Sequence, residues 1–271
     1  MYVTEGSQGA QRVLYYDRVE QFKSKVQSSG PLKGAWLTQG STLVAQNLAQ
    51  RDLDFLILDG QHGYLDETLI GPMLTAIAPF APLPIVRVPW NDPAIVMKTL
   101  DSGALGVICP MIDSREECEK FVRACRYAPR GYRSWGPTRL TSFDSSAANP
   151  QRANSILTLA MVETAKAADA IDGITSVEGL DAVFVGPADL AITYGYAPSD
   201  QRNEKMVAVL TRVVESCKTN GVLAGTAPLT LDDARVAAEI GFDFFAIGSD
   251  LSFMGVGAAS VAAQAASFGK S

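Results

Sequence analysis

This sequence is short of histidine, of paired cysteines and of clustered basic residues. His62 is its only histidine, and its four cysteines form no CxxC pair. We therefore expect neither a zinc knuckle nor a disulfide framework. Lysine and arginine stand at scattered positions in a chain of formal net charge −6, so the sequence lacks the basic surface that binds nucleic acid or an anionic membrane.

Long apolar runs are also missing from the sequence. The first 25 residues are mixed and polar, without the apolar core of a signal peptide. No stretch approaches the roughly 20 apolar residues that are needed to span a bilayer. The sequence therefore predicts a cytoplasmic protein that has no membrane partner and acts on small molecules.

Hydrophobic residues make up 47% of the 271 positions, which is enough to bury a full core. Short apolar runs alternate with helical patterns, as in parallel strands joined by crossover helices. The eight runs span residues 34–39, 55–60, 84–89, 106–111, 157–163, 182–187, 222–227 and 244–249. This pattern predicts an α/β fold, a (β/α)8 TIM barrel, that occupies residues 1–271 as one domain with its barrel core at about 31–250.

Additional segments flank and interrupt the predicted barrel. Residues 1–30 predict an extra N-terminal helix, and the Ala/Ser-rich chain after Leu251 predicts a final, weakly anchored helix. The long connection at 130–155 is rich in Gly, Pro and Ser, and such connections are commonly lids or substrate loops. Disorder is the alternative, but this connection also carries three aromatic residues, Tyr132, Trp135 and Phe143.

Polar residues that finish the apolar runs are the site candidates, because a (β/α)8 barrel gathers its active site at the carboxyl ends of its strands. They are Asp59, Gln61 and His62 after the second run, Arg87 in the third, Glu163 at the end of the fifth, Asp189 after Gly186, Pro187 and Ala188 behind the sixth, and Ser249 and Asp250 at the end of the eighth.

Glu163 and Asp189 would stand on neighbouring strands, where two carboxylates repel each other unless a proton or a cation lies between them. A divalent cation such as Mg²⁺ or Mn²⁺ takes oxygen ligands and keeps positions open for water and substrate. Each acid could instead stabilise the start of the helix that follows it. Because the two acids occur together, the sequence favours a metal site with Glu163 and Asp189 as ligands.

His62 and Arg87 are the predicted catalytic partners of this site. His62 lies just past a strand end and follows Asp59 by three residues. An isolated histidine is more often structural, but a nearby carboxylate can orient its ring, so we predict an acid/base role for His62 with Asp59 in support. Arg87 lies in a buried strand, where it needs either a structural carboxylate such as Asp59 or a substrate oxyanion.

The stretch from Gly186 through Pro187 and Ala188 to Asp189 places backbone N–H groups at a helix start, which suits a carboxylate or phosphate. No lysine lies within the eight runs, so a Schiff-base aldolase is disfavoured, with Lys166 as the one remaining candidate. We expect Cys109 to be a buried thiol, because no second histidine exists to activate it.

The segments FLILDGQH, VRVPWND, LDSGA, YAPRGYRSWGP, MVET and VFVGPADL occur in that order between Gly34 and Asp250. Through them the chain resembles the metal-dependent pyruvate aldolases of the HpcH/HpaI family, which include 4-hydroxy-2-oxoheptanedioate and 2-dehydro-3-deoxyglucarate aldolases. The resemblance implies that His62 is the general base and that Arg87 stabilises an oxyanion. It also implies that Glu163 and Asp189 bind Mg²⁺, Mn²⁺ or Co²⁺.

The resemblance further implies that Asp101, in LDSGA, raises the basicity of the catalytic histidine of a neighbouring subunit. The assembly would be a homo-oligomer, a trimer or hexamer, in which the last helix packs onto an adjacent barrel. From the residues alone, Asp101 would be a helix-end residue at the opposite face of the barrel. Three positions depart from the family pattern and bear on substrate preference: Gln61 replaces Glu, Met161 replaces a substrate-binding Gln of some members, and Ala191 replaces Ser.

The implied reaction cleaves or forms a 4-hydroxy-2-oxo acid through a metal-bound pyruvate enolate and an aldehyde. Pyruvate or another 2-oxo acid and the aldehyde are then the small-molecule partners. One alternative is a related metal-dependent lyase or decarboxylase that acts on oxaloacetate or a malyl-CoA-type substrate. Another is an inactive barrel that serves as a binding protein. That alternative predicts that a metal-ligating residue is missing, whereas Glu163 and Asp189 are both present.

Overall fold

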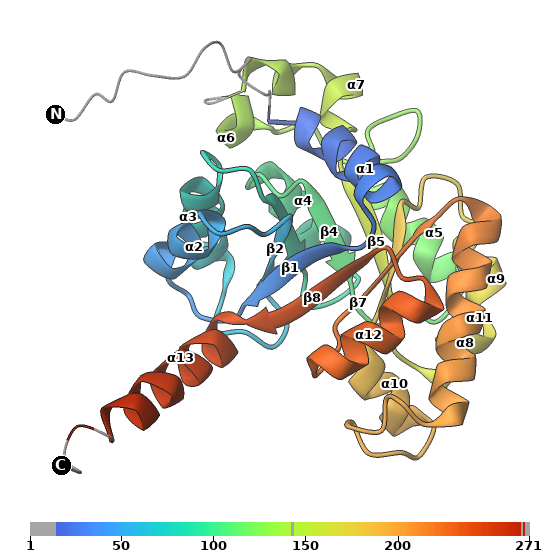
Figure 1. Cartoon of the computed structure of the whole chain (residues 1–271). Helices are drawn as coiled ribbons and strands as arrows, with labels where there is room; N and C mark the ends of the chain where they lie inside the picture. The colour runs from blue at the N-terminus through green and yellow to red at the C-terminus, as the bar shows by residue number, and fades with distance from the viewer. Residues whose placement is uncertain (1–14, 142–143, 267, 269–271) are drawn as a thin grey trace, which may run out of the picture.

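Eight parallel strands close into a barrel in the computed structural model, which describes residues 15–141, 144–266 and 268. Each strand pairs with the next along the chain, and β8 pairs with β1 to close the ring (Figure 1). The strands are β1 (Leu32–Leu37), β2 (Phe55–Asp59), β3 (Leu83–Arg87), β4 (Gly106–Cys109), β5 (Leu157–Val162), β6 (Ala182–Val185), β7 (Leu223–Thr226) and β8 (Phe244–Ser249). The predicted (β/α)8 barrel is confirmed.

The predicted runs overlap all eight strands, but most of them extend one or two residues past the observed strand end. The extra residues turn away from the sheet and begin the loops that carry the polar side chains. The surrounding helices are α1 (Asp17–Ser29), α2 (Thr42–Ala49), α3 (Glu67–Ile77), α4 (Pro93–Asp101), α5 (Arg115–Cys125), α6 (Thr138–Thr141), η1 (Ser145–Ala148), α7 (Pro150–Ala153), α8 (Ala165–Asp169), α9 (Ile171–Thr175), α10 (Pro187–Thr193), α11 (Glu204–Asn220), α12 (Leu231–Ile240) and α13 (Asp250–Ala265).

Aromatic rings fill the barrel interior. Phe244 packs edge-on against Phe55, with ring centroids 5.6 Å apart, and lies 6.0 Å from Phe184. Gly34 and Gly225 make room for these rings, because a Cβ at Gly34 would lie 2.3 Å from the Phe55 ring and one at Gly225 would lie 2.2 Å from the Phe244 ring. The barrel is therefore a packed core rather than a pore.

Helix α1 closes the N-terminal end of the barrel. Its Phe22 packs edge-on against Phe55 and Phe244, at 6.0 and 5.6 Å between centroids, and its Lys23 forms an ion pair with Asp181 at 2.8 Å. The N-terminal helix that the sequence predicts is confirmed over Asp17–Ser29, and residues 1–14 lie outside the described residues.

The long connection between α5 and β5 lies at the same N-terminal end, so it does not cover the carboxyl-end site of its own chain, and a role over the site of another subunit stays a prediction. Each helix of the barrel runs antiparallel to the strands, so a segment that joins a helix to the next strand starts and ends at the N-terminal end of the barrel. It holds α6, η1 and α7, which lie near α1 (Figure 1). Asp144 accepts a hydrogen bond from the Tyr15 N–H, and Arg152 pairs with Asp17. Phe143 lies outside the described residues.

Helix α13 projects from the opposite end of the barrel and touches little of its own chain (Figure 1). Its first residue, Asp250, is buried and accepts hydrogen bonds from the backbone N–H groups of Thr38 and Gln39. Beyond that joint the apolar side chains are exposed, including Val256 at 71% and Val261 at 67%. Within the described part of the chain, no helix combines the length and apolar character needed to cross a membrane.

Candidate active site

The carboxyl ends of β2, β3, β5 and β6 bring most of the predicted site residues together. Asp59 ends β2, Arg87 ends β3, Glu163 follows β5 directly, and Asp189 lies in the first turn of α10 behind β6. Parallel strands place these positions at one end of the barrel, as the sequence predicts. His62 lies on the loop that follows β2 and is exposed at the same end.

Arg87 and Asp59 form a buried, bidentate ion pair. Arg87 Nε and Nη2 donate to the two carboxylate oxygens of Asp59 at 2.9 and 2.6 Å. The guanidinium also lies 4.5 Å from the ring centroid of Trp36, a cation–π contact that sequence reasoning missed. Its remaining Nη1 is 3.9 Å from the sulfur of Met161, a weak acceptor. The structural carboxylate that the sequence allowed is therefore present, and one side of the guanidinium keeps donor capacity.

Asp59 also organises the loop that carries His62. Its Oδ1 accepts hydrogen bonds from the backbone N–H groups of Gln61 and His62, both at 3.1 Å, and its carbonyl accepts from Gly63 N. Asp59 thus supports His62 through the main chain. The predicted contact between this carboxylate and the imidazole is not made, and among the described residues no side chain forms a hydrogen bond with the ring.

Glu163 is a buried carboxylate with a single hydrogen-bond donor beside it. Its Oε1 accepts from Met111 N at 2.8 Å. Burial raises the pKa of Glu163, and the nearby Asp189 adds to that rise, whereas the Met111 N–H and Arg87 lower it. Met111 has φ of +54°, a left-handed conformation that destabilises a non-glycine residue by about 1–2 kcal/mol. No sequence signal indicates this contact.

The helix-cap interpretation of Glu163 is wrong, because Thr164 caps α8. The Thr164 hydroxyl accepts from Ala167 N at 2.9 Å and donates to Asp113 at 2.5 Å. Asp189 lies in the first turn of α10, where the helix dipole favours an acid, and it is exposed. The Glu163 carboxylate therefore does not cap a helix, and within the described chain no group donates a hydrogen bond to its Oε2.

Gly186 provides space between Glu163 and Met161. A Cβ at this position would lie 2.9 Å from Met161 Cε and 3.0 Å from Glu163 Oε2. A larger residue would push on the carboxylate, so glycine keeps one Glu163 oxygen accessible. Across the described residues, no group of three or more His, Cys, Asp or Glu side chains gathers at one point. Any cation here would have two protein carboxylates and would take further oxygen atoms from water or substrate.

Other candidates from the sequence have structural roles. Asp250 joins the start of α13 to the segment that follows β1. Lys166 is 71% exposed and 3.9 Å from Asp113, so it lacks the desolvated setting of a Schiff-base lysine. Cys109 is fully buried, and burial raises the pKa of its thiol well above the usual value, which makes it a poor nucleophile.

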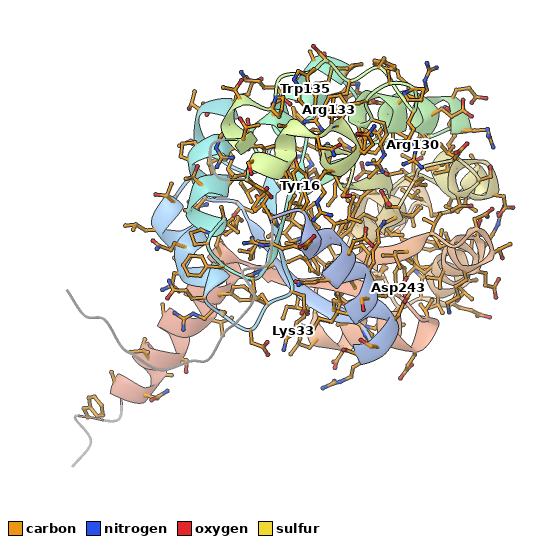
Figure 2. The ribbon with its side chains drawn as sticks, turned by 90° about the horizontal axis from the view of Figure 1, so that it is seen from above. Tyr16, Lys33, Arg130, Arg133, Trp135 and Asp243 are labelled. Atoms are coloured by element: carbon orange, nitrogen blue, oxygen red, sulfur yellow. The ribbon has the colours of Figure 1, made fainter. Side chains whose placement is uncertain are left out.

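Asp101 ends α4 and lies at the N-terminal end of the barrel, away from His62 of its own chain. It pairs with Arg133 at 2.8 Å. Figure 2 shows Arg133 next to Trp135 and above Tyr16, which precedes α1. A catalytic role for Asp101 therefore requires a second copy of the chain.

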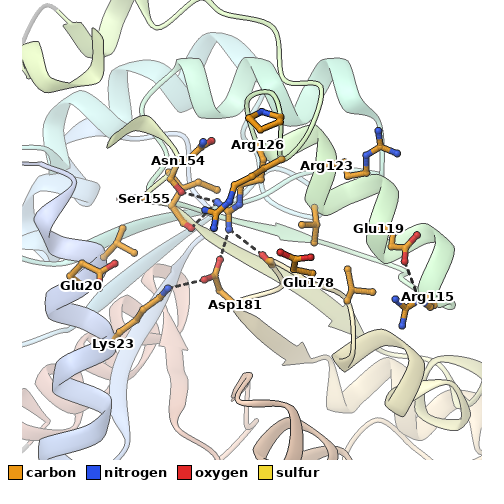
Figure 3. Close-up of a pocket in the computed structure, with 17 residues that line it drawn as sticks. Glu20, Lys23, Arg115, Glu119, Arg123, Arg126, Asn154, Ser155, Glu178 and Asp181 are labelled. Carbon is orange, nitrogen blue, oxygen red and sulfur yellow. Dashed lines mark hydrogen bonds and ion pairs between the residues drawn. The ribbon is translucent and has the colours of Figure 1, made fainter. Parts of the chain in front are cut away.

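A cleft of about 720 Å³ opens at the N-terminal end, between α1, α5 and the segments before β5 and β6 (Figure 3). Its inner cations are already paired, because Asp181 binds Lys23 at 2.8 Å and Arg126 at 2.7 Å. Arg126 also donates to the carbonyl groups of Asn154, Ile156 and Gly179. The cleft therefore holds the barrel base together and is separate from the site at the carboxyl ends.

The fold and the strand-end residues define a class: (β/α)8 barrel proteins that carry an acid pair, an arginine and a histidine at the carboxyl ends of the strands, where such barrels have their active sites. Residues 33–255 match the family model described as HpcH/HpaI aldolase/citrate lyase, and the chain belongs to this family.

Similar proteins agree with this assignment. The hydroxypyruvate/pyruvate aldolase of Rhizorhabdus wittichii is 39% identical over 236 residues, which cover 87% of this chain and 94% of that protein. The 4-hydroxy-2-oxo-heptane-1,7-dioate aldolase of Escherichia coli is 34% identical over 249 residues, or 90% and 94% of the two chains. A family protein from Burkholderia cenocepacia J2315 has a crystal structure with a TM-score of 0.83 and 29% identity, covering 91% of this chain and 98% of that one. The chain is an aldolase, a carbon–carbon lyase.

Proposed function

We propose that this aldolase cleaves or forms 4-hydroxy-2-oxo acids, with pyruvate or a close 2-oxo acid and an aldehyde as the two halves, and that it uses a divalent cation such as Mg²⁺, Mn²⁺ or Co²⁺. The observation that carries the proposal is the buried carboxylate of Glu163 beside the like charge of Asp189, with Arg87 at the same barrel end. The names of the two aldolase relatives support the substrate class.

Glu163 and Asp189 would hold the cation. Two like charges at adjacent strand ends favour a cation between them, and the space left by Gly186 gives access to one Glu163 oxygen. When bound, the cation would withdraw electron density from the 2-oxo acid and stabilise the negative charge that develops on its C3 carbon. The N–H groups of Ala188 and Asp189, which open α10 after Gly186 and Pro187, would orient the substrate carboxylate.

His62 would act as the base and Arg87 as the stabiliser of the aldehyde oxygen. In cleavage, His62 takes the proton of the 4-hydroxyl group, the electron pair of that O–H bond forms the aldehyde C=O, and the C3–C4 bond breaks. The C3–C4 electron pair remains on the 2-oxo acid half, which becomes pyruvate when C3 takes up a proton. Arg87 Nη1, which has only the weak sulfur acceptor of Met161, would donate to a developing oxyanion, while Asp59 holds the opposite side of the guanidinium.

A homo-oligomer, a trimer or hexamer, would complete the site. Asp101 lies at the end of the barrel opposite His62, so only another copy can bring it to that histidine. Exposed aromatic residues occur at both ends: Tyr64 and Trp90 near the site, at 79% and 57% exposure, and Trp135 near Asp101, at 50%. Contact between unlike ends is a heterologous interface, which forms a closed ring when the rotation between neighbouring copies is a whole fraction of a turn. The exposed apolar face of α13 would pack onto an adjacent barrel.

The direct test is an assay of enzyme stripped of metal with EDTA, given pyruvate or hydroxypyruvate and short aldehydes, and then supplied with Mg²⁺, Mn²⁺ or Co²⁺. We expect aldol product only after a cation is returned. Product formation with EDTA still present would contradict the metal assignment. Carbon dioxide release from oxaloacetate without any aldol product would instead favour the decarboxylase alternative.

A further inference from the structure

The ion pair between Asp101 and Arg133 is unequal in its exposure. Arg133 Nη2 donates to Asp101 Oδ1 at 2.8 Å, and the Arg133 side chain is 1% exposed, whereas that of Asp101 is 27% exposed. A Cβ at Gly136 would lie 3.3 Å from Asp101 Oδ2. Glycine at 136 thus leaves space beside the second oxygen. Asp101 Oδ1 is therefore held by the buried Arg133, and Oδ2 remains accessible to a neighbouring molecule.

The loop that carries Arg133 is held in a fixed shape. Backbone hydrogen bonds join Arg133 N to the Arg126 carbonyl at 2.9 Å and Tyr132 N to the Arg123 carbonyl at 3.0 Å. Gly131 is required where the loop crosses α5, because a Cβ there would lie 2.1 Å from the Arg123 carbonyl oxygen. The guanidinium is therefore delivered to Asp101 by a rigid support rather than by a mobile side chain.

The guanidinium of Arg133 has few partners among the described residues. Its guanidinium lies 4.6 Å from the Tyr127 ring centroid, its Nε is buried without a hydrogen-bond acceptor, and in the described chain Asp101 is its one carboxylate partner. Burial raises the pKa of Asp101, and Arg133 followed by Lys98 opposes that rise. A buried charge and an unsatisfied buried donor both lower the stability of the fold, so an apolar side chain would fasten the loop at a lower cost in free energy.

We propose that Arg133 is a positioning residue: it orients the carboxylate of Asp101 and supplies its counter-charge. Asp101 can then raise the basicity of His62 of a neighbouring subunit. This inference rests on the proposed function, in which Asp101 acts between subunits. The competing explanation is that Arg133 only fastens the 127–136 loop to α4. The two explanations differ in where the defect of an Arg133 variant lies and in how it depends on pH.

Mixed oligomers locate the defect. Two variants are expressed together with different tags, and oligomers that carry both tags are purified. When Asp101→Asn and His62→Asn chains assemble in equal amounts, about one third of the sites in doubly tagged trimers, and about one quarter in doubly tagged hexamers, combine an intact His62 with an intact Asp101. We expect the pair Arg133→Gln with His62→Asn to regain activity to the same extent. The pair Arg133→Gln with Asp101→Asn should regain none, because each chain then delivers a defective Asp101.

These outcomes separate the two levels of the proposal. A wild-type enzyme without aldol activity would overturn the proposed function itself. An active wild type whose Asp101→Asn and His62→Asn chains fail to complement each other would overturn the action of Asp101 between subunits and, with it, the role of Arg133. Recovery of activity in the Arg133→Gln and Asp101→Asn pair would show that Arg133 serves His62 of its own chain, which also overturns the inference.

The pH profile distinguishes positioning from fastening. The charged and titratable groups around Asp101 are Arg133, Lys98 and Tyr127. Without the cation at 133, Asp101 takes up a proton more readily, so the acid limb of kcat/KM in Arg133→Gln should move to higher pH by about 1 to 3 units. The loss should therefore be largest in acid and shrink as the pH rises, and Arg133→Lys, which keeps the charge, should move the limb less.

Asp101→Asn provides the matched profile. It has no carboxylate to titrate at 101, so its deficit should not shrink as the pH rises. If Arg133→Gln lost the same factor of kcat/KM at every pH, or if Arg133→Lys shifted the acid limb as far as Arg133→Gln, the positioning role would be wrong. Arg133→Lys retains the cation, so this comparison stays available even if Arg133→Gln folds poorly.

Discussion

Arg126 and Arg87 are buried arginines at opposite ends of the barrel, and their surroundings differ in completeness. Arg126 donates to three backbone carbonyls and pairs with Asp181 at 2.7 Å. Arg87 pairs with Asp59 through two nitrogens, but its third nitrogen has only the sulfur of Met161 at 3.9 Å. Both terminal nitrogens of Arg126 therefore have oxygen acceptors, whereas one terminal nitrogen of Arg87 keeps donor capacity for a ligand. Of these two arginines, the one at the carboxyl end of the barrel is the one that can still bind a ligand.

The largest expected effect at the carboxyl end comes from Glu163→Gln. The substitution keeps the size of the side chain and removes a charge that we assign to the cation, so kcat/KM should fall about a thousandfold, equivalent to about 4 kcal/mol. Cation affinity, measured by calorimetry, should fall with it. Glu178→Gln, in the cleft at the N-terminal end, is the matched control and should change neither. Full activity of Glu163→Gln with EDTA present would contradict the assignment.

Removing the acid from each buried pair should separate stability from activity. Asp59→Ala and Asp181→Ala each leave a buried guanidinium without its carboxylate, which should lower the free energy of unfolding by about 3–5 kcal/mol. Folded Asp181→Ala should keep its kcat/KM, and Asp59→Ala should lose activity as well. Denaturant unfolding and steady-state kinetics measure the two quantities. Equal losses of kcat/KM in both variants would remove the distinction between the two ends.

The Asp181 pair also has a defined pH dependence. Although burial opposes it, Arg126 and Lys23 hold the pKa of Asp181 below its usual value of 3.8. Its stabilising contribution is therefore present above that value and is lost as the pH falls through the lower pKa of the folded state. The stability difference between wild type and Asp181→Asn should be constant near neutral pH and should shrink in acid below about pH 4. A difference that grew on acidification would show that the pair is not the cause.

The sequence predicted the barrel because eight apolar runs with helical patterns between them fit few other folds. It also placed the acids correctly, since the end of a parallel strand can be located within one or two residues. It could not predict which end the 130–155 segment covers from its composition. That position follows from the helix before it and the strand after it, so counting the direction of each element would have shown it.

Contacts between distant backbone and side-chain atoms were beyond the sequence. The Met111 N–H reaches Glu163 only because the chain after β4 adopts a left-handed residue, and nothing in the residue type of Met111 signals that geometry. For Asp59 the sequence left two partners open, the imidazole of His62 and the guanidinium of Arg87. Only the packed barrel decides between them, and it pairs the Asp59 carboxylate with Arg87 and with the backbone N–H of His62.

A smaller effect is expected from Gly186→Ala, which tests the space beside Glu163. The new methyl group would lie about 3 Å from the Glu163 carboxylate and the Met161 methyl, closer than normal packing allows, so one of them must move. We expect kcat/KM to fall about ten- to hundredfold with a modest change in stability. Gly173→Ala, in α9 with Arg115 Cβ at 3.6 Å from its added Cβ, an ordinary contact distance, is the control and should be neutral or slightly stabilising. An unchanged kcat/KM in Gly186→Ala would show that Glu163 does not need this space.

The smallest effect concerns Met161, which lies between Arg87 and Glu163 and is almost fully buried. A thioether donates no hydrogen bond, so a hydroxyl group on the 2-oxo acid finds no partner on this side of the site. Met161→Gln would add a donor and an acceptor there, and should raise the ratio of kcat/KM for hydroxypyruvate over pyruvate by about tenfold. Met161→Leu has a similar volume and no polar atoms, and should leave the ratio within about twofold. If Met161→Leu moved the ratio as far as Met161→Gln, the selectivity would depend on shape rather than hydrogen bonding, because only the glutamine can offer the hydroxyl group a partner.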